Sequence, residues 1–170
     1  QTSTITVSVD DANSDDDFDA VADQTVSVST TDDDVAGFTI TETDGSTTVT
    51  EAGGTDTFTA VLNAQPDSNV TLQITSSDTG EATVTSLITF TPSNWDTPQI
   101  ATISGVDDDI IDGTVSSTIT ISIDDANSDD DFDAIADQAV TVSTTDDDVA
   151  GFTVTETEGS TGVDESGTTD

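Results

Sequence analysis

Every ionisable side chain in this sequence is an acid. The 170 residues include 37 Asp and Glu but no Lys, Arg or His, so the formal net charge is −37. The chain's own side chains cannot neutralise this excess, and a compact fold must keep the carboxylates in solvent or take up cations from outside. Many of the acids stand in runs of three, at Asp15 to Asp17, Asp32 to Asp34, Asp107 to Asp109, Asp129 to Asp131 and Asp146 to Asp148. Such clusters of hard oxygen ligands in loops are what calcium needs.

The composition excludes most catalytic chemistry and several classes of partner. Without Cys, His or Lys the chain lacks disulfides, thiolates, the usual general base and the Schiff-base amine. Asp78-Thr79-Gly80 matches the aspartic-protease triplet, but the repeat offers one such triplet where that chemistry needs two. A surface without Lys or Arg repels nucleic acid and anionic membranes, and no run of about 18 apolar residues could span a bilayer. We therefore predict that the protein is not an enzyme, binds no nucleic acid and does not insert into membranes.

A long internal repeat organises the chain. With a shift of 114 residues, Ser3–Asp56 aligns with Ser117–Asp170, and 43 of these 54 positions are identical. Most differences keep an apolar or acidic side chain in place, which preserves a core and a set of ligands. A period of this length corresponds to a whole domain. We predict that residues 1–34 are the C-terminal part of a preceding repeat, residues 35–148 one complete repeat and residues 149–170 the N-terminal part of the next.

Period-two alternation of apolar and polar side chains predicts seven strands in one repeat. They lie at 37–42, 56–62, 69–75, 87–91, 100–104, 117–123 and 139–143, and the shorter segment 82–85 is an eighth candidate. Asp-Gly, Gly-Gly and Pro-containing turn sequences separate them. Short strands at this spacing, without a helical period, predict an all-β fold of antiparallel β-sandwich repeats with seven or eight strands each.

The acids and the hydroxyl side chains occupy different places in the repeat. Outward strand positions are mostly Thr and Ser, whereas the carboxylates concentrate in the connections. A salt-adapted surface would spread its acids over every exposed face, so local ion binding explains the pattern better. Residues 35–148 carry 19 Asp and 3 Glu, and about three to six divalent ions would offset part of that charge.

The order of the motifs in the repeat resembles a Calx-beta domain. The motifs are VTEAG at 49–53, LNAQP at 62–66, SDTG at 77–80, FTPSNW at 90–95, GVDDD at 105–109 and TTDDD at 144–148. The resemblance covers the whole repeat and implies an Ig-like seven-stranded sandwich with calcium at one end. Such domains occur in sodium/calcium exchangers and, in tandem, in large bacterial surface and adhesion proteins.

The resemblance also implies a ligand set. The implied calcium ligands are Glu51, Asp78, Asp107, Asp108, Asp109, Asp146, Asp147 and Asp148, and Asp32, Asp33 and Asp34 would play the same part for the preceding repeat. Asp112 is a further candidate from its spacing alone. The acidic stretch 124–137 departs from the family pattern, because it contains more Asp than the resemblance implies.

That acidic stretch has a pattern of its own. Oxygen-bearing residues alternate as in the first positions of an EF-hand loop, at Asp125, Asn127, Asp129, Asp131 and Asp133, with a copy at Asp11, Asn13, Asp15, Asp17 and Asp19. Position six is Asp130 instead of Gly, and position twelve is Ala136 instead of a bidentate Glu. We therefore predict ion binding here in a geometry other than that of an EF-hand.

These observations favour a structural role outside the cell. We predict tandem calcium-binding sandwiches, with several Ca²⁺ ions per repeat, that form a rigid extracellular stalk or filament and contact neighbouring identical repeats. Calcium would bridge the junctions between repeats, because no Gly/Ser-rich or Pro-rich linker separates them. One alternative is an adhesin module that engages a surface, glycan, ice or mineral through Thr-rich faces or acidic loops. Another is a homopolymer, in which separate chains pair their edge strands into a fibre.

Overall fold

The computed structural model describes residues 1–156, 159, 162–163 and 165–167. The chain divides into two compact units, Gln1–Val35 and Ala36–Asp170. The prediction that residues 149–170 open a further repeat falls partly on 157–158, 160–161, 164 and 168–170, which lie outside the described residues.

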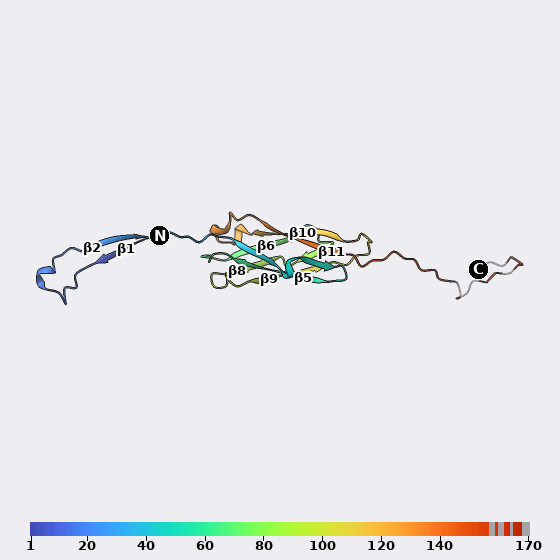
Figure 1. The fold of residues 1–170 in the computed structure, drawn as a ribbon, viewed down its shortest axis with the longest axis horizontal. Coiled ribbons are helices and arrows are strands. Elements are labelled where there is room, and N and C mark those ends of the chain that lie inside the picture. The colour runs from blue at the N-terminus through green and yellow to red at the C-terminus, as the bar shows by residue number, and fades with distance from the viewer. Residues whose placement is uncertain (157–158, 160–161, 164, 168–170) are drawn as a thin grey trace. The chain divides into compact units, whose positions relative to one another are not determined.

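Two sheets packed face to face form the second unit (Figure 1). The five-stranded sheet has the order β4 (Thr47–Thr50), β11 (Gln138–Thr145), β10 (Val115–Ile123), β6 (Val70–Ser76) and β8 (Leu87–Phe90). The four-stranded sheet has the order β3 (Phe38–Glu42), β5 (Thr55–Leu62), β9 (Gln99–Gly105) and β7 (Ala82–Val84). The predicted all-β sandwich is thereby confirmed.

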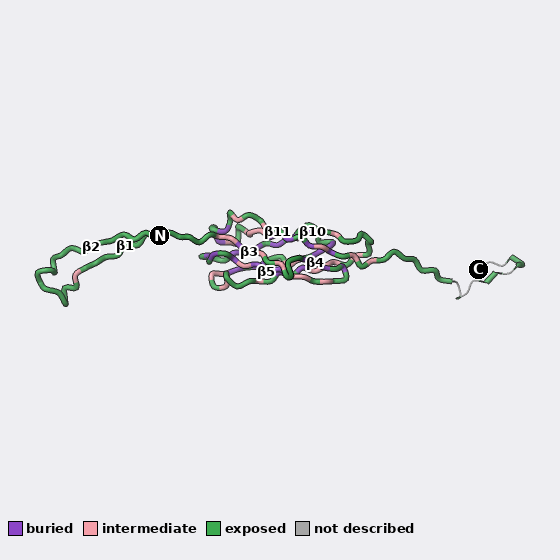
Figure 2. The backbone as a smooth tube through the Cα atoms, viewed as in Figure 1, coloured by how far each residue is buried: buried purple, intermediate pink, exposed green. Residues whose placement is uncertain are grey.

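The sandwich core follows from the period-two pattern. Along β10, for example, Ser117, Ile119 and Ile121 point inward and are buried, while the alternate residues point to the other face and are exposed or half-buried. Figure 2 shows that the buried segments lie in this unit, mostly in its strands. The largest fully buried apolar side chains come from both sheets and one loop and are Phe58, Phe90, Phe132, Leu72, Ile103, Ile119, Ile121, Val70 and Val142.

The first strand of the sandwich is split between the two sheets. β3 pairs with β5, and a 3₁₀ turn η2 (Thr43–Gly45) then carries the chain across to β4, which pairs with β11 in parallel. Asp44 and Gly45 both have positive φ, 55° and 79°, a conformation that suits an Asp-Gly pair. The sequence did not predict β4, and its parallel pairing is an exception to the antiparallel pattern of the other strand pairs.

The acidic stretch between β10 and β11 is fastened to the sandwich. It contains the 3₁₀ turns η3 (Asp125–Asn127) and η4 (Asp130–Phe132), and Phe132 is buried in the core. Asp129 is 7% exposed, and its Oδ2 accepts hydrogen bonds from the backbone N–H groups of Asp67 and Ser68, both at 2.8 Å. The hydrogen bond from Ser68 is the main cause of the lowered pKa of Asp129. Backbone hydrogen bonds from Asp131 and Asp67 also stabilise the charged carboxylate. Asp129 therefore anchors the loop.

The first unit is a single hairpin. β1 (Thr2–Val7) pairs with β2 (Gln24–Ser29) in an antiparallel two-stranded sheet, and the 3₁₀ turn η1 (Asp16–Phe18) lies in the connection. Apart from Val9, all residues of this unit are exposed.

We expect Asp129→Ala to lower the free energy of unfolding by about 1–3 kcal/mol, because it leaves the N–H groups of Asp67 and Ser68 without their acceptor. Urea unfolding of ion-depleted protein measures this. The matched control is Asp130→Ala, since Asp130 is exposed and belongs to the same run; it should change stability by less than about 0.5 kcal/mol. Equal effects of the two substitutions would contradict the anchoring role.

Candidate metal centre

Several chain segments meet at the end of the sandwich where β4, β9 and β11 finish and β7 and β10 begin. Backbone hydrogen bonds hold them together, from Glu51 N to Thr145 O (3.1 Å), from Gly105 N to Gly54 O (2.9 Å) and from Val106 N to Glu81 O (2.9 Å). Gly105 permits the close approach, because a Cβ there would overlap the carbonyl oxygen of Thr50. Main-chain contacts therefore hold the backbone at Glu51 and Glu81 in place.

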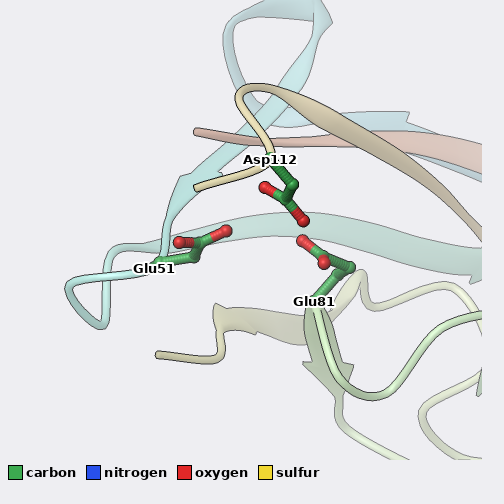
Figure 3. Close-up of side chains that lie close together, drawn as sticks. All are labelled: Glu51, Glu81 and Asp112. Carbon is green, nitrogen blue, oxygen red and sulfur yellow. The ribbon is translucent and has the colours of Figure 1, made fainter. Parts of the chain in front are cut away.

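Two groups of carboxylates share Glu51. In the first, one oxygen each of Glu51, Glu81 and Asp112 lie within 4.8 Å of one another. In the second, the same holds for Glu51, Asp108 and Asp148. Figure 3 shows the first group, whose side chains reach toward a common space from the turn after β4, the start of β7 and the β9–β10 loop.

The two glutamates of this site are buried. Glu51 is 1% exposed and Glu81 is 8% exposed. The Oε2 atoms of both, and Oδ2 of the half-buried Asp148, have no hydrogen-bond partner. Buried carboxylates normally have paired or hydrogen-bonded oxygens, because desolvating an unpaired charge is costly. Unpartnered carboxylate oxygens on residues of both groups, in a chain without cationic side chains, match the donor set of a hard cation.

Burial and mutual repulsion shift the titration of these groups. Burial, followed by the charges of Asp146 and Asp112, raises the pKa of Glu51 from 4.5 to about 7. Burial also raises the pKa of Glu81 and that of Asp148. Without a counter-ion, burial and repulsion therefore oppose the ionisation of Glu51, Glu81 and Asp148.

Asp146 supports the site in a different way. Its Oδ2 accepts a hydrogen bond from Gly113 N at 2.9 Å, and its Oδ1 accepts one from Asp148 N. The bond from Gly113 is the main cause of the lowered pKa of Asp146. Asp146 is thus a stable anion that joins the end of β11 to the loop carrying Asp112.

The structure does not bring every predicted ligand into these groups. Asp78 is exposed, and its Oδ1 accepts a hydrogen bond from Gly80 N in a tight turn. Asp107, Asp109 and Asp147 are exposed at the edge of the site, and Asp107 and Asp109 contribute to the raised pKa of Asp148. Metal binding by these four residues stays a prediction.

The remaining predicted ligands lie elsewhere. The loop with Asp125, Asn127, Asp129, Asp131 and Asp133 connects β10 to β11 at the opposite end of the sandwich, and no three of its carboxylates form a group like those above. Its copy, with Asp11, Asn13, Asp15, Asp17 and Asp19, is exposed in the first unit, as are Asp32, Asp33 and Asp34. Ion binding at these positions also stays a prediction.

Sequence reasoning missed Glu81. The residue directly precedes the short strand β7 and follows the Asp78-Thr79-Gly80 turn that was chosen instead. The sequence signal that could have pointed to this residue was an acid at the start of a strand, close to a predicted ligand. The sequence does not show that Glu81 is buried. It also does not show that Asp78, three residues earlier, is exposed and shapes a turn.

The fold is shared with known proteins, whereas no family is assigned by sequence. No family model and no curated protein matches the chain. Domains 1–6 of the surface layer protein SbsC give a TM-score of 0.50 at 18% identity, over 86% of this chain and 16% of that one. At this identity the likeness concerns the fold alone.

Two Calx structures are also similar. The apo-form Calx CBD1 domain has a TM-score of 0.46 at 18% identity, over 65% of this chain and 98% of that one. CBD12 from CALX1.2 has a TM-score of 0.46 at 20% identity, over 64% of this chain and 44% of that one. Among the residues that the structure describes, none forms a helix long and apolar enough to cross a membrane.

We expect the ion-depleted protein to lose stability as pH rises from about 4.5 to about 7. The folded state binds more protons than the unfolded state in this window, because folding raises the pKa of Glu51. Urea unfolding across this range measures the slope, and Glu51→Gln should flatten it. Asp96→Asn, at an exposed acid outside both groups, controls for the loss of one charge. A slope that is unchanged in Glu51→Gln would contradict the assignment.

Proposed function

We propose that this chain is a non-catalytic structural module of an extracellular protein, in which the β-sandwich binds calcium at one end. The observation that carries the proposal is the convergence of buried Glu51 and Glu81, with unpartnered oxygens, on Asp112, Asp108 and Asp148. These buried carboxylates need a cation from outside the chain if they are to be charged while the protein is folded. Two adjacent groups that share Glu51 favour two neighbouring ions, with Glu51 as the bridging ligand.

Calcium suits these ligands better than other common ions. All candidate donors are oxygens, which disfavours zinc and other ions that prefer nitrogen or sulfur. The donors come from several loops with different backbone geometry, and Ca²⁺ accepts six to eight oxygens in flexible arrangements, whereas Mg²⁺ demands a near-ideal octahedron and retains waters. Calcium concentrations outside cells keep even weak sites filled, which supports the proposed extracellular location.

The position of the site favours a mechanical role. Asp146 and Asp148 directly follow β11, the last strand of the sandwich, at the predicted boundary with the next repeat. An ion held by Asp148, Glu51 and Asp108 would tie the exit segment to the turn after β4 and to the β9–β10 loop. The junction to the following polypeptide would then be stiff when calcium is bound and flexible when it is removed. Adhesion through the Thr-rich faces remains the alternative prediction.

We expect calcium to raise the melting temperature and the free energy of unfolding of ion-depleted protein, and excess chelator to reverse both. An ion that binds only the folded state stabilises it by about 2.7 kcal/mol at one hundred times its dissociation constant. Scattering measurements should show a shorter and more variable particle in chelator. If calcium changes neither the unfolding nor the scattering, the proposal is wrong.

We further expect Glu51→Gln and Glu81→Gln to have opposite effects in the two conditions. Each removes a buried negative charge, so the ion-free protein should be as stable as the parent or more stable. Each also removes a ligand, so the stabilisation gained from calcium should fall. Calorimetric unfolding with and without calcium measures both effects, with Asp96→Asn as the control that alters neither. A uniform loss of stability in both conditions would indicate a packing role instead.

A further inference from the structure

The hairpin Gln1–Val35 repeats the hairpin formed by β10 and β11. Residues 3–34 align with 117–148, and the two hairpins have the same register, since Ile5 faces Val26 as Ile119 faces Val140. The differences are conservative, such as Val7/Ile121 and Ser27/Thr141. The same sequence pattern therefore forms the same local structure twice.

The two hairpins differ in what covers their apolar side chains. Ile119, Phe132 and Val140 are at most 3% exposed, because they pack into the hydrophobic core between the two sheets. Their counterparts Ile5, Phe18 and Val26 are 54%, 58% and 56% exposed. Val7 and Val28 are exposed as well. A two-stranded hairpin with one apolar face is marginal alone, and exposed apolar patches of this kind mark a surface that another element covers.

The side chains that fasten the second hairpin by hydrogen bonds have identical counterparts in the first hairpin. Asp129 Oδ2 accepts from Asp67 N and Ser68 N, and Ser128 Oγ accepts from Thr71 N at 3.0 Å. Their counterparts in the first hairpin are Asp15 and Ser14. Asp15 keeps the local bond from Asp17 N that Asp129 makes with Asp131 N. The first hairpin thus carries acceptors suited to a turn like Asp67–Ser68.

The strand edges provide a third match. In the sandwich, the second edge of β10 pairs with β6, and the second edge of β11 pairs with β4. The sheet formed by β1 and β2 has two strands, so the corresponding edges are available for pairing. The first hairpin therefore has an apolar face, hydrogen-bond acceptors and strand edges like those of the second hairpin. In the second hairpin all three contact the segment Ala36–Thr114.

We infer that the apolar face of Gln1–Val35 docks against a second half-sandwich with the sequence pattern of Ala36–Thr114, carried on the same polypeptide ahead of Gln1. The half-sandwich of a separate copy is already filled by its own β10 and β11, and exchanging one hairpin for an equivalent one gains no contacts. In the repeat, Gln1 occupies the position of Val115, which directly follows Thr114 in the sandwich.

The test is a chain extended at its N-terminus by a copy of Ala36–Thr114. In calcium, hydrogen exchange of the β1 and β2 amides should slow by on the order of a thousandfold relative to the unextended chain, because exchange then requires unfolding of a whole domain. In the extended chain, Phe18→Asp should restore fast exchange in β1 and β2 while leaving β10 and β11 protected. The same substitution in the unextended chain should leave both exchange and unfolding unchanged.

Two outcomes would overturn the inference. One is fast exchange of β1 and β2 in the extended chain, while β10 and β11 of the same molecule are protected. The other is a dimer of the unextended chain in sedimentation that Phe18→Asp abolishes, because the occupant of the face would then be another chain.

Discussion

Two glutamates buried next to each other, in a chain that has no cationic side chain, are the constraint on which one end of this sandwich depends. Glu51 and Glu81 are 1% and 8% exposed, and their backbones are hydrogen-bonded to Thr145 and Val106. Desolvation and repulsion oppose their ionisation. Only protons or cations from solution can relieve this, so the stability of the fold is linked to the composition of its surroundings.

The acids of the chain divide between two roles that composition alone does not distinguish. Some carboxylates shape the backbone, since Asp78, Asp129 and Asp146 each accept hydrogen bonds from nearby main-chain N–H groups. These bonds stabilise the loop and satisfy an oxygen of each acid. Glu51 and Glu81 instead carry unpartnered buried oxygens. The first kind builds the loops that hold the second kind in place.

Much of the fold could be predicted from the sequence, because strand alternation is a local property. β5, β6, β9 and β10 coincide closely with the predicted segments. β4 was missed because its sequence Thr-Thr-Val-Thr contains one apolar residue, and the burial of Thr47 depends on the turn at Asp44-Gly45. Phe132 stands in the most acidic stretch, where nothing local indicates that it enters the core.

The candidate site was predicted less completely, because burial and convergence are non-local. Glu51, Asp108, Asp112 and Asp148 were among the candidates, and the structure brings them together. Glu81 was not, since its burial comes from contacts with residues distant in sequence, such as the bond from Val106 N to its carbonyl. Asp129 could not be separated from Asp130 and Asp131, because only the turn at Asp67–Ser68 distinguishes them.

The two copies of the hairpin separate local from non-local effects within one molecule. Strand pairing, register and the 3₁₀ turn around Phe18 and Phe132 recur in both copies, so neighbouring residues are sufficient to specify them. Burial does not recur, since Ile119 and Val140 lie in the core of the sandwich, whereas their counterparts Ile5 and Val26 are exposed. The acids follow the same rule: Asp32–Asp34 and Asp146–Asp148 have the same sequence and the same local bond. Asp148 of the second run groups with the buried Glu51, so that run belongs to a candidate metal centre built by the domain that precedes it.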